Sequence, residues 1–239
     1  MRRDHRPYFV KKAFLKLQQV YVRRFLAPQF AALGSGYTFM RPWYVEIFGA
    51  PIRIGKYANI VAAPDQRVRL AVWAAEAGRG AIDIGDYCLI SPGVRVSSAD
   101  RIRIGDNCML ANGVYLTDSD WHDLYNRTAM GRTAPISIGA NAWIGDSAIV
   151  CKGVSLGENS IVGAGSVVVQ SIPPNCVAAG NPARVVKELD PRQCFTTRKQ
   201  WFQDPGIRDG GLDEFDREIL EANTFRHWLR YLLFPSRED

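Results

Sequence analysis

A single histidine stands among carboxylates near the middle of the chain, in the segment TDSDWHD at residues 117–123. Histidine suits proton transfer at working pH, so His122 could take or give a proton as a general base or acid. Such a base is usually oriented by a partner that accepts from its second ring nitrogen. In an extended segment, residues two or four positions apart point to the same side, so Asp120 and Asp118 would both share a face with His122. Asp118 lies nearer to a strand. A backbone carbonyl could accept this hydrogen bond instead. The segment therefore indicates proton transfer, although each aspartate, Asp123 included, could also be a turn former.

The remaining histidines and the cysteines do not suggest a second centre. His5 and His227 lie near the two ends of the sequence. The five cysteines form no CxxC pair, and their odd number argues against a disulfide framework. Cys88 and Cys108 each follow an isoleucine by four residues in successive repeats, so we expect small core residues there rather than reactive thiols. No metal site is expected.

Residues 138–168 repeat with a period of six and would form a rigid support for such a segment. A branched aliphatic residue heads each block of six, and glycine follows four of these heads. The heads are Ile138, Ile144, Val150, Leu156, Val162 and Val168. A helix would scatter residues six apart over different faces, whereas a chain that turns a corner every six residues stacks them in one row. The sequence therefore predicts a parallel β-helix with these heads in its core.

A shorter motif, aliphatic–x–aliphatic–Gly, marks the starts of successive coils. It occurs as IRIG, IDIG, IRIG and ISIG at residues 52–55, 82–85, 102–105 and 136–139. The middle interval of 20 residues fits one three-sided coil with a small offset. The other two intervals, of 30 and 34 residues, are too long, and we assign the excess to loops within residues 65–80 and 118–135. The second loop contains His122, and loops on a rigid scaffold commonly carry chemistry.

The two ends of the chain differ from the repeats. Residues 8–27 predict an amphipathic helix that ends near Pro28. Its apolar stripe consists of Phe14, Leu17, Tyr21 and Phe25. Residues 1–28 carry eight basic residues against one acidic residue. This helix could pack on the main domain, or its basic residues could bind an anionic membrane surface. Nucleic-acid binding is not expected, because no recognition motif accompanies the charge. Residues 213–234 predict one or two helices that cap the column or make oligomer or membrane contacts.

Three features of this sequence resemble the hexapeptide-repeat acyltransferases, most closely the coenzyme A-dependent sugar and antibiotic O-acetyltransferases. They are NAWIGDSAIVCKGVSLGENSIVGAGSVV at residues 141–168, SIPPNCVAAGNPARVV at residues 171–186, and a histidine inside a loop that interrupts the repeats. The resemblance implies a mainly β fold, a left-handed parallel β-helix with an N-terminal helix and C-terminal helices. The expected parts are a basic helical extension at 1–43, the repeat domain at 44–187 with the inserted loop 118–135, and a helical extension at 188–239.

The resemblance also implies roles for individual residues. His122 would be the general base that removes the acceptor's proton, with Asp120 or Asp118 as a candidate partner. The donor would be an acyl-CoA, expected to be acetyl-CoA, whose arm would lie along the column. The positions that match donor-contacting ones are Trp143, Gly163, Ala164, Val169, Arg184 and Lys187. The candidates for acceptor binding are Trp121, Asp123 and Asn112.

Several of these positions also have ordinary structural explanations. Trp121 and Trp143 could pack at a subunit contact, and Arg184 and Lys187 could be solvated surface residues. Val169 stands where many sugar acetyltransferases have Thr or Ser, so one hydrogen bond to the donor would be missing. The long loop DWHDLYNR also differs from the short GHPxH type of the maltose and galactoside enzymes, which puts their substrates in doubt for this chain.

The expected function is an acyl-CoA-dependent O-acyltransferase acting on a sugar hydroxyl of a surface polysaccharide or its precursor. Amine transfer to an amino sugar or antibiotic, and a non-catalytic β-helix scaffold, are the alternatives. A γ-class carbonic anhydrase needs three histidines and a nucleotidyltransferase needs a further domain, so neither fits. The resemblance implies a homotrimer. We expect it in the cytoplasm, with the basic helix as a candidate membrane contact, because no segment has the pattern of a secretory signal or a transmembrane helix.

Overall fold

The computed structural model describes residues 4–73, 79–204 and 212–235. The chain divides into two compact units. Tyr21–Lys199 forms the repeat column, and Met1–Val20 together with Gln200–Asp239 forms a helical unit.

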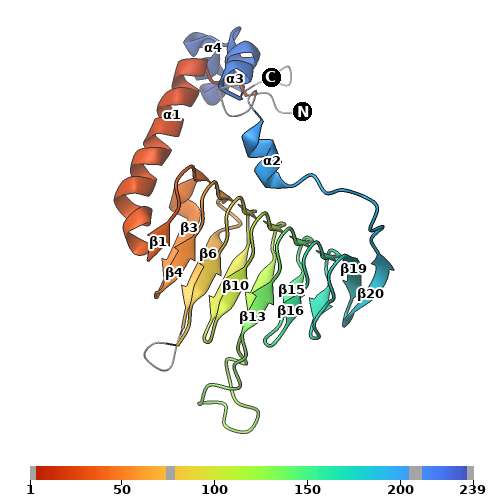
Figure 1. Cartoon of the computed structure of the whole chain (residues 1–239). Helices are drawn as coiled ribbons and strands as arrows, with labels where there is room; N and C mark the ends of the chain where they lie inside the picture. The colour runs from red at the N-terminus through yellow and green to blue at the C-terminus, as the bar shows by residue number, and fades with distance from the viewer. Residues whose placement is uncertain (1–3, 74–78, 205–211, 236–239) are drawn as a thin grey trace. The chain divides into compact units, whose positions relative to one another are not determined.

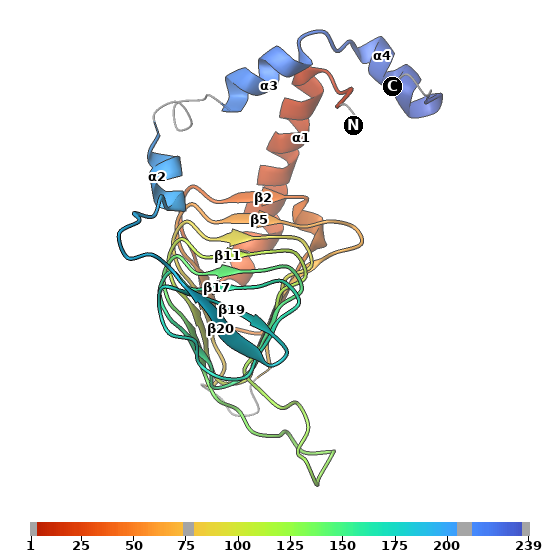
Figure 2. The same ribbon diagram turned by 90° about the vertical axis from the view of Figure 1, so that its right-hand side faces the viewer.

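The column is built from three sheets, which the chain visits in turn as it winds (Figures 1 and 2). Sheet A contains β1 (Ala32–Leu33), β4 (Ile52–Ile54), β7 (Ile82–Ile84), β10 (Ile102–Ile104), β13 (Ile136–Ile138) and β16 (Ser155–Leu156). Sheet B contains β2 (Thr38–Met40), β5 (Asn59–Val61), β8 (Leu89–Ile90), β11 (Met109–Leu110), β14 (Trp143–Ile144), β17 (Ile161–Val162), β19 (Cys176–Gly180) and β20 (Ala183–Glu188). Sheet C contains β3 (Val45–Phe48), β6 (Val68–Val72), β9 (Arg95–Ser98), β12 (Tyr115–Thr117), β15 (Ile149–Val150) and β18 (Val167–Val168). The paired strands are parallel except β19 and β20, which are antiparallel.

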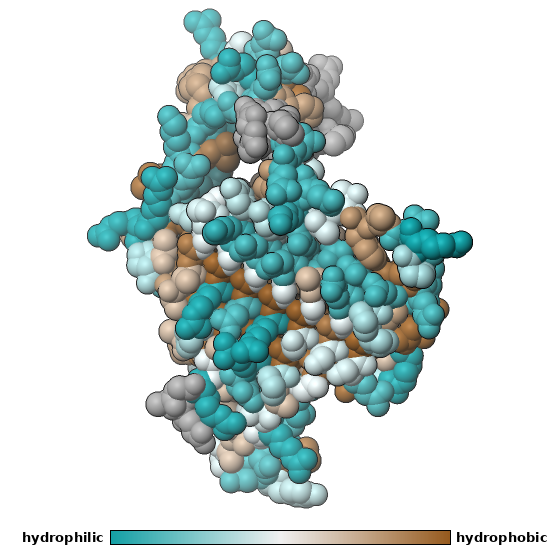
Figure 3. Space-filling view, in the orientation of Figure 1, coloured by the Kyte–Doolittle hydropathy of each residue, from teal (hydrophilic) through white to brown (hydrophobic). Residues whose placement is uncertain are grey.

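The core of the column is made by the residues that head the six-residue blocks. The six predicted heads point inward and are at most 3% exposed, which confirms the predicted parallel β-helix. On the face shown in Figure 3, apolar and polar side chains form bands across the column, as expected when equivalent residues of successive coils stack. Cys88 and Cys108 are buried, and their thiols donate to the carbonyls of Gly105 and Gly139, so both are core residues as predicted.

The corners of the column explain the glycine and asparagine that recur in the repeats. Gly139 begins a corner where coils approach closely, and a Cβ there would lie 2.6 Å from the backbone nitrogen of Glu158. Asn141 and Asn159 adopt φ of 56° and 58° at corners one coil apart, a conformation that asparagine tolerates better than most residues. The Asn141 amide donates to Asn159 Oδ1 at 2.9 Å, which links the two coils. At these two corners the asparagines thus turn the chain and bond to one another.

The column begins earlier than the sequence predicted. Paired strands start at Ala32, whereas the repeat domain was expected to start near Tyr44. Leu33, Phe39 and Val45 already follow the six-residue period, but an aromatic residue replaces the aliphatic head in the second block. The extra loop residues that were predicted within residues 65–80 are divided between the connection from β5 to β6 and the connection from β6 to β7. Residues 74–78 of the second connection lie outside the described residues.

The N-terminal helical segment continues to Gln29, close to its predicted end, but its type changes after Tyr21. Helix α1 (Tyr8–Tyr21) is followed by a π-helical turn, η1 (Val22–Leu26), and a 3₁₀ turn, η2 (Ala27–Gln29). Val22 and Leu26 of the π turn are buried, whereas Leu17 and Phe25 of the predicted stripe are 57% and 56% exposed. A further 3₁₀ turn, η3 (Pro42–Tyr44), precedes β3.

The C-terminal segment forms short helices, as predicted. These are α2 (Arg198–Gln203), α3 (Leu212–Leu220) and α4 (Phe225–Leu233), the last capped by Thr224, whose hydroxyl accepts from the His227 backbone N–H at 3.2 Å. Within the helical unit, Lys11 and Lys12 of α1 pair with Asp216 and Asp213 of α3 at 2.6 and 2.5 Å. None of the described helices is both long and apolar enough to span a membrane.

Candidate active site

The loop at residues 118–135 leaves the column after β12 and returns at β13. Its two arms run antiparallel: the Asp120 N–H donates to the Arg132 carbonyl at 2.9 Å, and the Gly131 N–H donates to the Asp120 carbonyl at 2.8 Å. Gly131 is required at this crossing, because a Cβ there would lie 2.4 Å from the Asp120 carbonyl oxygen and 2.6 Å from that of His122. The loop is therefore a hydrogen-bonded structure and can hold a side chain in place.

The ring of His122 is oriented by a carbonyl of the same loop. Its Nδ1 lies 2.8 Å from the carbonyl oxygen of Arg127. A carbonyl oxygen only accepts hydrogen bonds, so Nδ1 must carry the proton and Nε2 of the neutral ring is left with its lone pair. The side chain is exposed. This arrangement suits a general base whose free nitrogen faces a substrate.

The aspartates proposed as partners of this ring have other roles. Asp118 is fully buried and accepts from the Ser98 hydroxyl at 2.7 Å and from the Ala99 and Asp100 N–H groups at 2.6 and 3.0 Å. Burial raises the pKa of this carboxyl above its ordinary value, although the hydrogen bonds oppose that shift. The carboxylate therefore fastens the start of the loop to the preceding coil.

Asp120 and Asp123 also bond elsewhere. Asp120 forms an ion pair with Lys152 at 2.6 Å. Asp123 accepts from the backbone N–H groups of Asn126 and Tyr125 at 2.8 and 2.9 Å, and these bonds lower the pKa of its carboxyl. In the described part of the chain, no hydrogen bond joins any of the three carboxylates to the His122 ring. The structure thus supports the carbonyl alternative and corrects the assignment of Asp118 and Asp120 as orienting groups.

Trp121 ties the loop back to the column. Its Nε1–H lies 3.0 Å from Thr117 Oγ1 and 3.3 Å from the Tyr115 hydroxyl, both on β12. The guanidinium of Arg95 lies 3.7 Å from the centre of the Tyr115 ring. A continuous series of contacts therefore connects the outer face of sheet C with the residue beside His122.

Some predicted donor positions lie on sheet B. Trp143 on β14 is 47% exposed and stands opposite Ile161, which stands opposite Val177 on β19. Lys187 on β20 stands opposite Val177 and continues this outward row. Arg184 also lies on β20, where its guanidinium donates to the Ala183 carbonyl at 2.9 Å.

The remaining donor positions lie on sheet C and on the corner between the sheets. Gly163 and Ala164 form the turn between β17 of sheet B and β18 of sheet C. Val169 follows β18 and is 49% exposed. Because β18 pairs with β15 and β15 pairs with β12, Val169 directly follows a strand of the sheet from which the loop departs. One column thus presents the predicted donor positions on two different faces.

Asn112 lies at the corner between β11 and β12, away from the loop's hydrogen bonds. Its Oδ1 is buried and has no hydrogen-bond partner among the described residues, and a Cβ on Gly93 would lie 3.1 Å from it. A buried amide oxygen without a partner is costly unless a ligand supplies a donor. Its assignment to acceptor binding stays a prediction.

Two contributors to the site were not predicted from the sequence. Lys152 pairs with Asp120, and the carbonyl of Arg127 orients the histidine. The six-residue register could have suggested the lysine, because Leu116 of β12 stands opposite Val150 of β15 and the loop begins two residues later. The carbonyl depends on the turn formed inside the loop, which the repeat pattern does not specify.

Comparison with known proteins identifies the repeats and their relatives. Residues 81–118 and 135–170 match the family model described as the hexapeptide repeat of succinyl-transferase, leaving the His122 loop between the two segments. Galactoside O-acetyltransferase from Escherichia coli (strain K12) is 43% identical over 167 residues, covering 68% of this chain and 66% of that protein. A putative acetyltransferase from Saccharomyces cerevisiae is 46% identical over 63 residues, covering 26% of this chain and 32% of that protein. The chain thus spans at most about two thirds of the length of these curated relatives.

Solved structures show the same fold. A variant of AntD, an N-acyltransferase from Bacillus cereus solved with dTDP and coenzyme A, aligns with a TM-score of 0.53 and 16% identity, covering 80% of this chain and 96% of that one. The expected mainly β fold, a left-handed parallel β-helix with helices at both ends, is confirmed. With the repeat match and the galactoside O-acetyltransferase relative, this fold shows that the chain belongs to the hexapeptide-repeat acyltransferase family.

Proposed function

We propose that the protein is an acetyl-CoA-dependent O-acetyltransferase in which His122 is the general base. The observation that carries this proposal is the hydrogen bond from its Nδ1 to the Arg127 carbonyl, which leaves Nε2 free to accept a proton. The acetyltransferase names of the relatives support the reaction class.

The reaction uses this nitrogen twice. His122 Nε2 takes the proton of the acceptor hydroxyl as that oxygen attacks the thioester carbonyl of the donor. The bond to sulfur then breaks, and the same ring returns its proton to the departing thiolate, which regenerates the neutral base and balances the reaction. The Arg127 carbonyl keeps the ring in one tautomer throughout and stabilises the imidazolium that forms between the two steps.

The residues assigned to the donor fit an acyl-CoA chemically. Ala164 is a small, exposed residue at the corner between β17 and β18, and Gly163 beside it packs against Ala179, where a Cβ would lie 3.0 Å from the Ala179 Cβ. Val169 is exposed and offers an apolar contact but no side-chain hydrogen bond. Arg184 and Lys187 place positive charge on the antiparallel hairpin at the end of sheet B, where they would attract phosphate groups.

We also propose that the working form is a homotrimer. Support comes from the split of the donor positions: Trp143 lies on sheet B, whereas Val169 directly follows β18 of sheet C and the His122 loop leaves the column after β12 of that sheet. A site between two neighbouring columns would bring sheet B of one column and sheet C of the next together. Light scattering at micromolar concentration is expected to give three times the chain mass, and a monomer would contradict this assembly.

For the acceptor, we propose a sugar hydroxyl, on a surface polysaccharide or its precursor. The similarity to galactoside O-acetyltransferase supports a sugar. Precursors of this kind are handled at a membrane, and α1 exposes Leu17 and Val20 beside Lys16, which would suit peripheral contact with anionic lipid from the cytoplasm. Cosedimentation of the full chain with vesicles containing phosphatidylglycerol, but not with neutral vesicles, is the expected result; equal recovery with both would exclude this contact.

The decisive experiment compares the wild-type chain with His122→Ala. Release of free thiol from acetyl-CoA is followed over a panel of sugars, amino sugars and aminoglycosides. Loss of the base is expected to lower kcat by about 10²–10⁴-fold while calorimetry gives an unchanged Kd for CoA. Turnover near the wild-type value would refute the base assignment. Transfer to amines alone would favour the N-acetyltransferase, and a wild-type chain that neither binds CoA nor turns over would favour a scaffold.

A further inference from the structure

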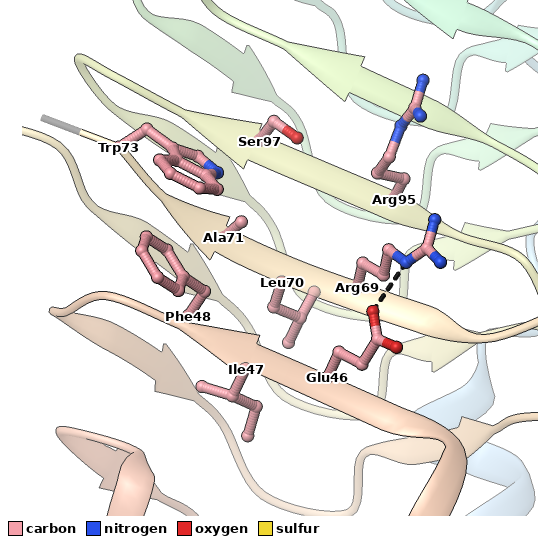
Figure 4. A pocket seen from close by; sticks show the side chains of 9 residues that line it. All are labelled: Glu46, Ile47, Phe48, Arg69, Leu70, Ala71, Trp73, Arg95 and Ser97. Atoms are coloured by element: carbon pink, nitrogen blue, oxygen red, sulfur yellow. Dashed lines mark hydrogen bonds and ion pairs between the residues drawn. The ribbon is translucent and has the colours of Figure 1, made fainter.

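The outer face of sheet C carries a hollow of about 380 Å³ over β3, β6 and β9 (Figure 4). One end is apolar: Phe48 and Trp73 stack with ring centres 4.1 Å apart and are each about half exposed. The other end is charged, with Arg69 and Arg95 beside Glu46. Neither end was assigned a role by the sequence motifs.

The charged end continues into a second hollow of about 250 Å³ that contains no carboxylate. It is lined by Arg67, Arg69, Arg95, Tyr115, Gly93 and Gly113. Glu46, from the first hollow, pairs with Arg67 at 2.5 Å and with Arg69 at 2.7 Å. A third hollow of about 430 Å³ adjoins Arg67 and Arg69 and includes the exposed Asp65, which forms no ion pair with any of the residues described. Three guanidinium groups therefore surround the second hollow, and a single bonded carboxylate offsets two of them.

The third guanidinium, that of Arg95, is held in place by an aromatic ring and pairs with no carboxylate in the described part of the chain. Arg95 stands directly opposite Arg69 on the neighbouring strand, although like charges opposite one another are unfavourable. Its guanidinium lies 3.7 Å from the centre of the Tyr115 ring, a cation–π contact that fixes the group while leaving its N–H donors available. A fixed guanidinium without an acidic partner is well suited to bind an oxyanion.

These hollows lie close to the catalytic loop. Tyr115, which supports Arg95, receives the hydrogen bond from Trp121, the neighbour of His122. Ser97, which lines the first hollow, stands opposite Thr117, the last residue before the loop. Neighbouring strands are about 4.8 Å apart, so the charged end lies within about 10 Å of the strand that carries the loop.

We propose that this face binds the acceptor and selects acceptors that carry an oxyanion, a phosphate or a carboxylate attached to the sugar. Arg67, Arg69 and Arg95 hold the anion, and the Phe48–Trp73 pair supports the apolar face of the sugar ring. The anion thereby fixes the acceptor while its hydroxyl reaches His122. This inference rests on the proposed function and specifies the acceptor class of that same site.

The first test compares acceptors that share a glucose ring and its ring hydroxyls and differ in the group at C6, which is a hydroxymethyl, a phosphate ester or a carboxylate. Glucose, glucose 6-phosphate and glucuronic acid are offered with acetyl-CoA, and thiol release gives kcat/KM for each. At least one anionic sugar is expected to exceed glucose by about 10-fold or more, with an advantage that falls as salt rises. The ratio of kcat/KM for glucose 6-phosphate to kcat/KM for glucuronic acid tells whether phosphate or carboxylate is preferred. Equal values for all three sugars would overturn the inference while leaving acetyl transfer established.

The second test uses Arg95→Gln with Arg103→Gln as its matched control. Arg103 is an exposed arginine of sheet A, on β10, and lines none of the three hollows. Arg95→Gln is expected to raise KM for the anionic sugar about 10- to 100-fold with a smaller effect on kcat, and Arg95→Lys to recover part of the loss. The control variant should match the wild type. Equal effects of the two glutamine variants would refute the site.

A binding measurement separates this inference from the proposed reaction. Calorimetry with inorganic pyrophosphate, at saturating CoA so that the donor's phosphate positions are filled, is expected to show binding to the wild type and weaker binding to Arg95→Gln. If the wild-type chain binds pyrophosphate in this way but transfers no acetyl group, the anion site is supported and the proposed function is rejected. A wild-type chain that binds no pyrophosphate and prefers no anionic sugar would reject the anion site.

Discussion

Replacing Asp118 by asparagine separates a structural role from a catalytic one. The Asp118 carboxylate accepts from the backbone N–H of Ala99 through Oδ1, and from the Ser98 hydroxyl and the Asp100 N–H through Oδ2. Asparagine has the same shape, but an NH₂ group replaces one oxygen. Whichever way the amide turns, at least one backbone N–H then faces another donor.

The expected cost follows from these contacts. A buried donor left without an acceptor costs about 1–3 kcal/mol, and the neutral amide oxygen also accepts more weakly than a carboxylate. We therefore expect Asp118→Asn to lower the free energy of unfolding by about 2–3 kcal/mol. Asp120→Asn is the matched control, since Asp120 is partly exposed and its ion pair with Lys152 is worth at most about 1 kcal/mol.

Urea unfolding followed by circular dichroism measures the stability, and thiol release under native conditions measures kcat. Because the Arg127 carbonyl orients the ring, kcat of Asp118→Asn is expected to stay within about 10-fold of the wild type. Loss of an orienting carboxylate in a Ser-His-Asp triad costs about 10⁴-fold. A fall of that size with unchanged stability would show that Asp118 acts on His122 and that the loop geometry described above is wrong.

The same substitution has an expected pH dependence. Burial raises the pKa of the Asp118 carboxyl above its ordinary 3.8, so the folded chain holds this proton more tightly than the unfolded chain. The resulting stabilisation is fully present below about pH 3.8 and is lost as pH rises through the folded pKa. Asparagine does not titrate, and Asp118→Asn should therefore cost more stability at pH 4 than at pH 7. A larger cost at pH 7 would mean that the hydrogen bonds outweigh burial.

Two further substitutions test how the loop holds its base. Gly131→Ala places a Cβ 2.4 Å from the Asp120 carbonyl oxygen, so the loop must shift. We expect kcat to fall about 10²-fold while the urea midpoint of the column stays unchanged. A wild-type kcat would contradict the described crossing of the two arms. Trp121→Phe removes the indole hydrogen bonds to Thr117 and Tyr115, which are worth about 1 kcal/mol. It should therefore lower kcat about 5-fold. No change in the rate of thiol release would show that these hydrogen bonds are not needed to hold the loop.

The sequence predicted the parts of the fold that repeat. Ile138 and its equivalents could be recognised because each coil imposes the same inward position on its head residue. The first coil was missed because Phe39 occupies a position that later coils fill with aliphatic residues. The change from α-helical to π-helical geometry at Val22 was not predicted, because a π turn depends on packing around Val22 and Leu26, which a helical spacing does not reveal.

The candidate site was predictable in its location but not in its contacts. The break in the repeats located His122 in a loop, and the structure shows that loop. Sequence proximity then favoured Asp120 and Asp118 as partners, yet their oxygens bond to Lys152 and to the preceding coil. The partner is a carbonyl at Arg127, whose position depends on the turn between residues 123 and 129. Such long-range and turn-dependent contacts cannot be read from a period of six.

The antiparallel hairpin of β19 and β20 has a consequence for the behaviour of the protein in solution. A column of parallel coils ends in open strand edges, onto which another chain could pair and continue the ladder. On sheet B the final strand, β20, runs against the direction of the coils, and a bulge between Val177 and Ala178 shifts its register. A further coil would meet this edge with the wrong polarity. The hairpin therefore protects sheet B against end-to-end growth into fibres, and keeps the column at a defined length.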